Sequence, residues 1–154
     1  MRLTITKRTA SLLLALVLMT LVTRSGATAP LPVLPNPVLY LMGTEAFQTG
    51  GKEFIRYKFD VLNKDSYPAE LFAAAPALPP CGKNTRASRT WVDFYDFHGK
   101  RLYGFCALGK PDDLTGIWFA LESGIEPPPS YVYIEMNDRQ TNTKYKSNLA
   151  ETTP

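Results

Sequence analysis

The chain has 154 residues, with 17 Lys or Arg, 14 Asp or Glu, two cysteines and one histidine. This length suits a single domain, and one histidine without a closely spaced cysteine pair leaves too few ligands for a structural metal site. Four of the basic residues lie before residue 28, so 13 basic and 14 acidic residues remain after it. Because no Lys/Arg cluster remains there, we expect no nucleic-acid partner. We also predict no cofactor and no metal.

Residues 1–27 have the features of a secretory signal peptide. Basic residues open the chain, and the apolar run that follows at 10–22 is shorter than the roughly 20 residues that cross a bilayer. Small residues then suit cleavage after Ala27, or after Ala29, where a proline would follow the cut. We therefore expect a secreted or periplasmic protein with no stable membrane span after cleavage. An uncleaved membrane anchor is the alternative.

The next segment, residues 28–37, contains four prolines and is predicted to form an extended, non-helical arm. A β-sandwich domain is predicted over residues 38–148, followed by a C-terminal tail at 149–154. Residues 53–63 give the clearest strand signal, because apolar residues alternate with mostly charged ones. Seven strands are expected in all, at residues 38–44, 53–63, 91–96, 101–108, 114–122, 131–137 and 143–147.

Two short segments between these strands carry local signals. Residues 47–51 end in Gly50-Gly51 and are predicted to form a turn. Three alanines at 73–75 permit one helical turn, and the prolines that follow prevent a longer helix.

Residues 91–108 give the clearest hairpin signal. Two aromatic-rich runs flank His98-Gly99, and a glycine in the second position suits a tight primed turn. A two-residue loop pairs Phe94 with Tyr103, whereas a three-residue loop shifts the register by one and alters the pairs.

Asp93 indicates which face of this hairpin is buried, because burying an unpaired carboxylate costs several kcal/mol. The face predicted to point inward carries Val92, Phe94, Tyr103 and Phe105. The outward face carries Trp91, Asp93, Tyr95, Leu102, Gly104 and Cys106. This outward face is apolar for a solvated surface, so we expect the segment at 71–80 to cover it.

The only two cysteines, Cys81 and Cys106, are predicted to form a disulfide. An exported chain meets an oxidising compartment, and no third cysteine competes. The bond would hold residues 71–80 across the hairpin beside Trp91.

Seven short strands with Pro and Gly between them resemble the fibronectin type III and immunoglobulin-like superfamily. The resemblance covers residues 37–147 and rests on the strand count and on the late strand Tyr-Val-Tyr-Ile-Glu-Met at 131–136. It implies a single two-sheet antiparallel sandwich of about seven strands. The sequence departs from the immunoglobulin pattern because Cys81 lies in a loop and is close to Trp91. A fold of this kind implies no function by itself.

The titratable residues do not suggest an enzyme, because catalysis needs groups that converge. His98 is placed on a hairpin tip, and Asp112-Asp113 is most simply a solvated turn. Asp93 and Asp96 fall on different faces of their strand. We therefore predict no catalytic residue and a protein that is not an enzyme.

Four aromatic residues are predicted to point outward and form a possible binding patch: Trp91, Tyr95, Trp118 and Tyr133. Rings of this kind are enriched in protein-binding sites and also stack on sugars. They form a second small core instead if the 71–80 segment packs over them. We predict an extracytoplasmic interaction module that binds a protein partner, with a glycan-binding module as the alternative.

Overall fold

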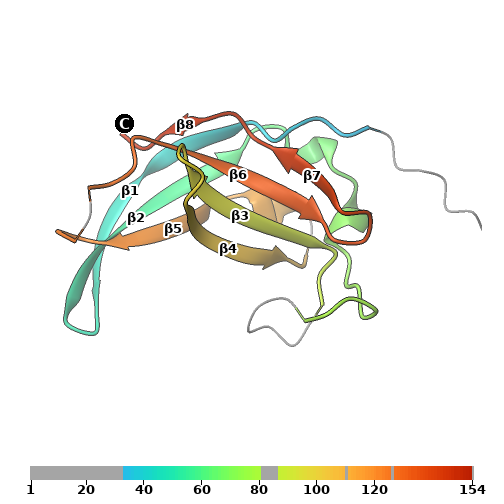
Figure 1. Ribbon diagram of the computed structural model, residues 1–154, viewed down its shortest axis with the longest axis horizontal. Coiled ribbons are helices and arrows are strands. Elements are labelled where there is room, and N and C mark those ends of the chain that lie inside the picture. Colours follow the sequence, from blue (N-terminus) through green and yellow to red (C-terminus); the bar gives the residue numbers. More distant parts are fainter. Residues whose placement is uncertain (1–32, 81–86, 110, 126, 154) are drawn as a thin grey trace, which may run out of the picture. The chain divides into compact units, whose positions relative to one another are not determined.

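Eight β-strands form two antiparallel sheets in the computed structural model, which describes residues 33–80, 87–109, 111–125 and 127–153 (Figure 1). The first sheet has the order β1-β2-β5, with β1 at Leu39–Thr49, β2 at Lys52–Val61 and β5 at Ile117–Glu122. The second has the order β4-β3-β6-β7, with β3 at Thr90–Asp96, β4 at Arg101–Ala107, β6 at Tyr131–Asp138 and β7 at Thr143–Lys146; β8, at Ala150–Glu151, also pairs with β6. The all-β fold with two antiparallel sheets is confirmed.

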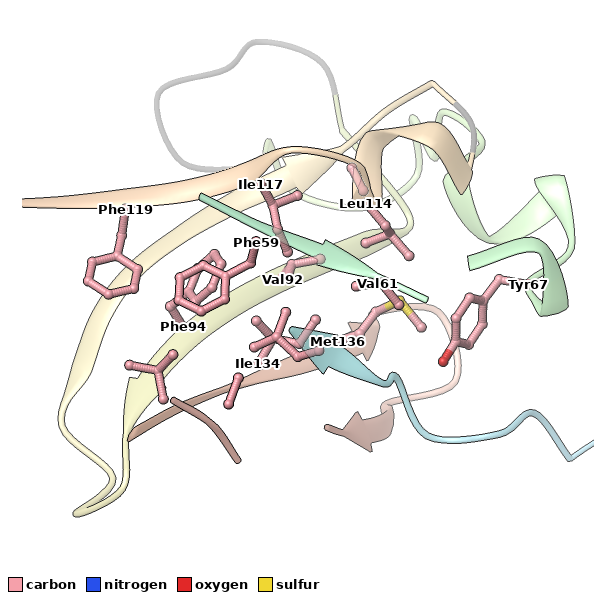
Figure 2. Packing of buried hydrophobic residues seen from close by; sticks show 14 of the residues in the cluster. Phe59, Val61, Tyr67, Val92, Phe94, Leu114, Ile117, Phe119, Ile134 and Met136 are labelled. Carbon is pink, nitrogen blue, oxygen red and sulfur yellow. The ribbon is translucent and has the colours of Figure 1, made fainter. Parts of the chain in front are cut away.

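The core lies between the sheets, where side chains of both meet (Figure 2). Phe59 of β2 and Phe119 of β5 approach Phe94 of β3, with ring centroids 5.6 and 5.3 Å from it. All three rings are at most 1% exposed. The alternation predicted for the second strand is also confirmed, because Tyr57, Phe59 and Val61 are buried.

Three short 3-10 helices complete the secondary structure of the described residues: η2 at Lys64–Ser66, η3 at Ala69–Phe72 and η4 at Pro111–Leu114. The helical turn expected at 73–75 therefore lies one turn earlier. The strand expected from residue 114 begins at Ile117, because η4 instead carries Leu114 into the core.

The segment at 71–80 begins in the core rather than on the outer face of the β3–β4 hairpin, so the expectation was wrong for Leu71 and Phe72. Leu71 and Phe72 are buried in the core, where they remove more apolar surface from water than a surface position would. The backbone then pairs with the residues just before β3, through a 2.8 Å hydrogen bond from Ala75 N to Ala87 O. Farther on, Pro79 O accepts a 2.8 Å hydrogen bond from Arg139 Nη2.

The hairpin has the predicted register from the pair Phe94–Tyr103 to the end of the hairpin that lies away from the loop. The loop itself has three residues rather than two, because Asp96 N donates to Lys100 O at 3.0 Å and Gly99 has a φ of 84°. A β-bulge restores the register, since Leu102 is the extra residue of β4.

The prediction of which hairpin side chains point inward is correct for β3 but not for β4. Val92 and Phe94 are fully buried, but Tyr103 is 42% exposed and Phe105 is half-buried. The reason is topological: β4 is an end strand of its sheet, so its side chains lie at the open margin between the sheets.

The ends of the domain also differ from expectation. Strand β1 runs on to Thr49, and only Gly50-Gly51 form the turn, with φ values of 59° and 76°. Within the expected tail, β8 pairs with β6, and Thr152 is 3% exposed. The described part of the Pro-rich arm, residues 33–37, forms neither helix nor strand, and Leu34 packs in the core.

Candidate interaction surfaces

The four aromatic residues predicted to form one patch lie on two different surfaces. Trp91 and Tyr95 of β3 and Tyr133 of β6 belong to the outer face of the larger sheet, all half-buried. Trp118 lies on β5 in the smaller sheet and is 40% exposed. The predicted patch is therefore divided, and each part has its own neighbours.

On the larger sheet, Tyr95 lies directly opposite Tyr133, and their rings stack with centroids 5.3 Å apart. Lys146 of β7 places its Nζ 4.1 Å from the Tyr133 ring centroid. Burial raises the pKa of Tyr95, and the nearby carboxylates of Asp93 and Glu135 add to this. The rings thus form a stack whose faces already contact other side chains.

Trp91 has a similar partner, because the Arg101 guanidinium carbon lies 5.7 Å from its ring centroid. Arg101 Nε also donates to Asp93 Oδ1 at 2.6 Å. Gly104 provides the space for this pair: a Cβ at this position would lie 2.2 Å from both Arg101 Nη2 and Asp93 Oδ1. Arg101 and Asp93 thus lie beside Trp91 on this outer face.

The second surface is a row of side chains at one open margin of the two sheets. Its members, which we call the open-edge cluster, are Phe47, Arg56, Trp118, Tyr103 and Phe105. The Arg56 guanidinium carbon lies 4.7 Å from the Phe47 ring centroid and 4.5 Å from that of Trp118. The Tyr103 ring stacks on Trp118 at 6.1 Å with an interplanar angle of 11°.

A hollow of about 260 Å³ opens beside this cluster. Its walls are Tyr103 and Phe105 of β4, and Ile117 and Trp118 of β5. Small-molecule sites usually have about 300–1,000 Å³, so this hollow is small for a ligand of that kind.

Asp113 lies at the rim of the hollow. It is half-buried, and its Oδ2 accepts hydrogen bonds of 2.6 Å from the backbone N–H groups of Leu108 and Gly109. The prediction of a solvated Asp112-Asp113 turn was therefore wrong for Asp113, which binds the backbone that directly follows β4.

A second hollow, of about 460 Å³, lies between the hairpin tip and the Pro127–Pro128–Pro129 connection. His98 is exposed at this tip, as predicted, and its ring centroid is 3.6 Å from that of Phe97. Asp96 Oδ1 accepts a 2.8 Å hydrogen bond from Lys100 N and so closes the loop.

Cys106 lies half-buried on β4, opposite Trp91. Cys81 falls outside the described residues, so the disulfide stays a prediction.

Within the described ranges, no three His, Cys, Asp or Glu side chains are grouped as a metal site requires. Over the same residues, no helix is long and apolar enough to cross a membrane. Comparison with protein-family models, curated proteins and solved structures found no match.

Some members of the open-edge cluster were not identified from the sequence. Period two placed Arg56 on the outer face of its strand, and Trp118 was predicted to point outward. Their contact depends on β2 lying beside β5, two strands that are more than 50 residues apart in the chain. No local sequence pattern indicates that these two strands are neighbours.

Proposed function

We propose that this protein is a non-catalytic, extracytoplasmic interaction module that binds a partner protein through the open-edge cluster. The observation that carries the proposal is the composition and exposure of this surface. Trp118 and Tyr103 are 40% and 42% exposed, and Arg56 contacts Trp118. Trp, Tyr and Arg are the residue types that contribute most to the binding energy of protein interfaces.

Protein contact fits these rings better than sugar stacking does, because a sugar needs a free ring face. Trp118 is approached by Arg56 from β2 and by Tyr103 from β4. On the other surface, Arg101 lies over Trp91. A glycan would have to displace these neighbours, so glycan binding is the alternative rather than the first proposal.

We also propose that the strand arrangement is fibronectin type III or immunoglobulin-like. In that arrangement, strands A, B and E share one sheet, and strands C, F and G share the other. Strands β1, β2 and β5 correspond to the first set, and β3, β6 and β7 to the second. Strand β4 joins β3, as the additional strand of variable-type domains joins their second sheet.

The proposal of a non-enzyme is supported by the position of the single histidine. His98 is exposed at a loop tip and packs on Phe97. The nearest carboxylates on the hairpin have structural partners, because Asp93 bonds Arg101 and Asp96 bonds backbone. Robust turnover of any substrate by the purified protein would contradict this part of the proposal.

Site-specific photo-crosslinking in the source cells tests the partner surface. The photoreactive residue p-benzoylphenylalanine is placed at Tyr103 and, as a matched control, at Tyr131, which is 40% exposed on the larger sheet. We expect a discrete cross-linked protein from position 103 only, and its loss when Trp118→Ala is added. Equal cross-linking from both positions would contradict the assignment of the surface.

A glycan array distinguishes the glycan-binding alternative from the protein-binding proposal. Under the protein-binding proposal, neither the parent protein nor its variants bind sugars above background. Sugar binding that is lost in Trp91→Ala or Trp118→Ala would instead support the glycan-binding module.

A further inference from the structure

The free edge of β5 offers backbone hydrogen-bonding groups. In the described part of the chain, β5 pairs only with β2, beside which it appears as the orange arrow in Figure 1. Ser123 N donates to Glu53 O at 2.8 Å and extends the β2–β5 ladder by one pair. Because hydrogen-bonded pairs alternate in an antiparallel ladder, the N–H and C=O groups of Trp118 and Ala120 point away from β2.

Three other end strands, β1, β7 and β4, carry features that discourage strand addition. On β1, the Asn148 side chain bonds both Leu39 N and Leu39 O, at 2.8 and 2.9 Å, and a bulge follows at 41–43. The short β7 carries Lys144 and Lys146. On β4, a bulge at Leu102 interrupts the edge.

Strand β5 lacks these features. Its first five residues, Ile-Trp-Phe-Ala-Leu, contain no charge and no proline, and all six of its residues pair with β2 in a regular register. Its one charge, Glu122, lies at the end of the strand and is bound by Lys52 at 2.8 Å. An uncharged, regular edge is a site of pairing with another chain.

We propose that the partner binds by adding an extended segment to the free edge of β5, so that the sheet β1-β2-β5 gains a fourth strand. This inference rests on the proposed function and names the partner's binding element. The occupant is a strand because the groups on offer are those of the backbone. One bulky apolar side chain of this segment enters the 260 Å³ hollow, whose most buried lining residue is Ile117, 5% exposed, with half-buried Phe105 also in its wall.

The test uses a phage-displayed library of random nine-residue peptides, selected on the purified secreted protein. We expect enriched peptides with apolar residues at alternate positions and no internal proline. N-methylation of a synthetic peptide at alternate amides should abolish binding, because only every second amide faces β5. Methylation at the intervening amides should have little effect. A library that yields no enriched peptide contradicts strand addition.

Ala120→Pro is the matching change in the protein. It removes an N–H that points away from β2, and edge strands tolerate proline at such a position. Affinity for the selected peptide should fall about tenfold or more, since a backbone hydrogen bond is left unmade. The comparison variant, Ala120→Ser, keeps the N–H and should bind at least about tenfold more tightly than Ala120→Pro.

The outcomes separate this inference from the proposed function. If Trp118→Ala abolishes binding and Ala120→Pro does not, the open-edge surface stands and strand addition is overturned. If Ala120→Pro instead abolishes a concentration-dependent dimer of the unliganded protein, the occupant is a second copy and the proposal is wrong. The N-methyl series gives an independent answer if Ala120→Pro fails to fold, because it leaves the protein unchanged.

Discussion

Arg89 and Asp138 form a two-point ion pair that joins the start of β3 to the end of β6. Arg89 Nε donates to Asp138 Oδ1 at 2.8 Å, and Arg89 Nη2 donates to Oδ2 at 2.7 Å. Asp138 is 1% exposed and also accepts hydrogen bonds from Thr141 Oγ1 and Gln140 N. This carboxylate therefore connects three segments at one end of the larger sheet.

Arg89→Ala should lower the free energy of unfolding by about 3–5 kcal/mol, because it leaves a buried carboxylate without its cation. Denaturant titration of the parent and the variant measures this difference. The matched control is Lys144→Ala, which breaks the Lys144–Glu135 pair on the exposed β7. An exposed pair contributes less than about 1 kcal/mol. Equal losses in the two variants would contradict the structural role of the buried pair.

The same carboxylate should make stability depend on pH. Burial alone would raise the pKa of Asp138, but hydrogen bonds from Arg89, Thr141 and Gln140 outweigh it and hold the pKa below its ordinary value. A carboxyl whose pKa is lower in the folded state stabilises the fold fully above its unfolded pKa, about 3.9. That contribution is lost as the pH falls through the folded pKa.

Unfolding of the parent and of Asp138→Asn is therefore compared between about pH 7 and pH 2. We expect the parent's advantage over the variant to be constant above about pH 5 and to shrink below pH 4. A difference that does not change over this range would show that Asp138 does not titrate with a lowered pKa.

Gly104→Ala should disturb the Arg101–Asp93 pair. The new Cβ would lie 2.2 Å from an atom of each partner and 3.0 Å from Trp91 Cζ2. The cost should be about 1–3 kcal/mol of unfolding free energy, the usual range for an overpacked site. Adding Arg101→Ala removes one of the clashing side chains, so the double variant should be more stable than the sum of the two single effects predicts. Strict additivity would mean that the clash is relieved elsewhere.

Local patterns account for the parts of this fold that the sequence predicted. The alternation around Phe59 depends only on neighbours in the chain, and the side chains expected to be inward there are buried. The hairpin register was also correct beyond Phe94, but for an incomplete reason. A three-residue loop and the bulge at Leu102 each shift the pairing by one residue, and the two shifts cancel.

Positions that depend on distant segments were not predictable in the same way. Trp91 and Trp118 were both predicted to point outward, yet they belong to different sheets. The alternation of apolar residues along a strand does not indicate which strands are neighbours. The segment at 71–80 was expected over the outer face of the hairpin, because that face is apolar and a Cys81–Cys106 bond would hold the segment there. Leu71 and Phe72 instead enter the core, and Leu71 O accepts the hydroxyl hydrogen bond of buried Thr90.

The predicted disulfide between Cys81 and Cys106 should stabilise the protein. It would close a loop of about 25 residues, for which chain entropy gives about 3.5 kcal/mol. Cys81→Ala should therefore lower the free energy of unfolding by about 2–4 kcal/mol. The loss should appear first as faster hydrogen exchange around residues 73–75 and 87–89, which pair with each other on either side of Cys81 in the chain. The core around Phe59 and Phe94 should stay protected.

Thiol titration of the protein, purified without reductant and then denatured, decides whether the bond exists. We expect no reactive thiol before reduction and two after it, because the chain has only two cysteines. Chemical reduction should then destabilise the parent by the same amount as the substitution, and should leave Cys81→Ala unaffected. Two reactive thiols per chain without reduction would contradict the disulfide. The stability of the loop would then depend on the backbone pairing of Ala75 with Ala87 and of Arg89 with Ala73.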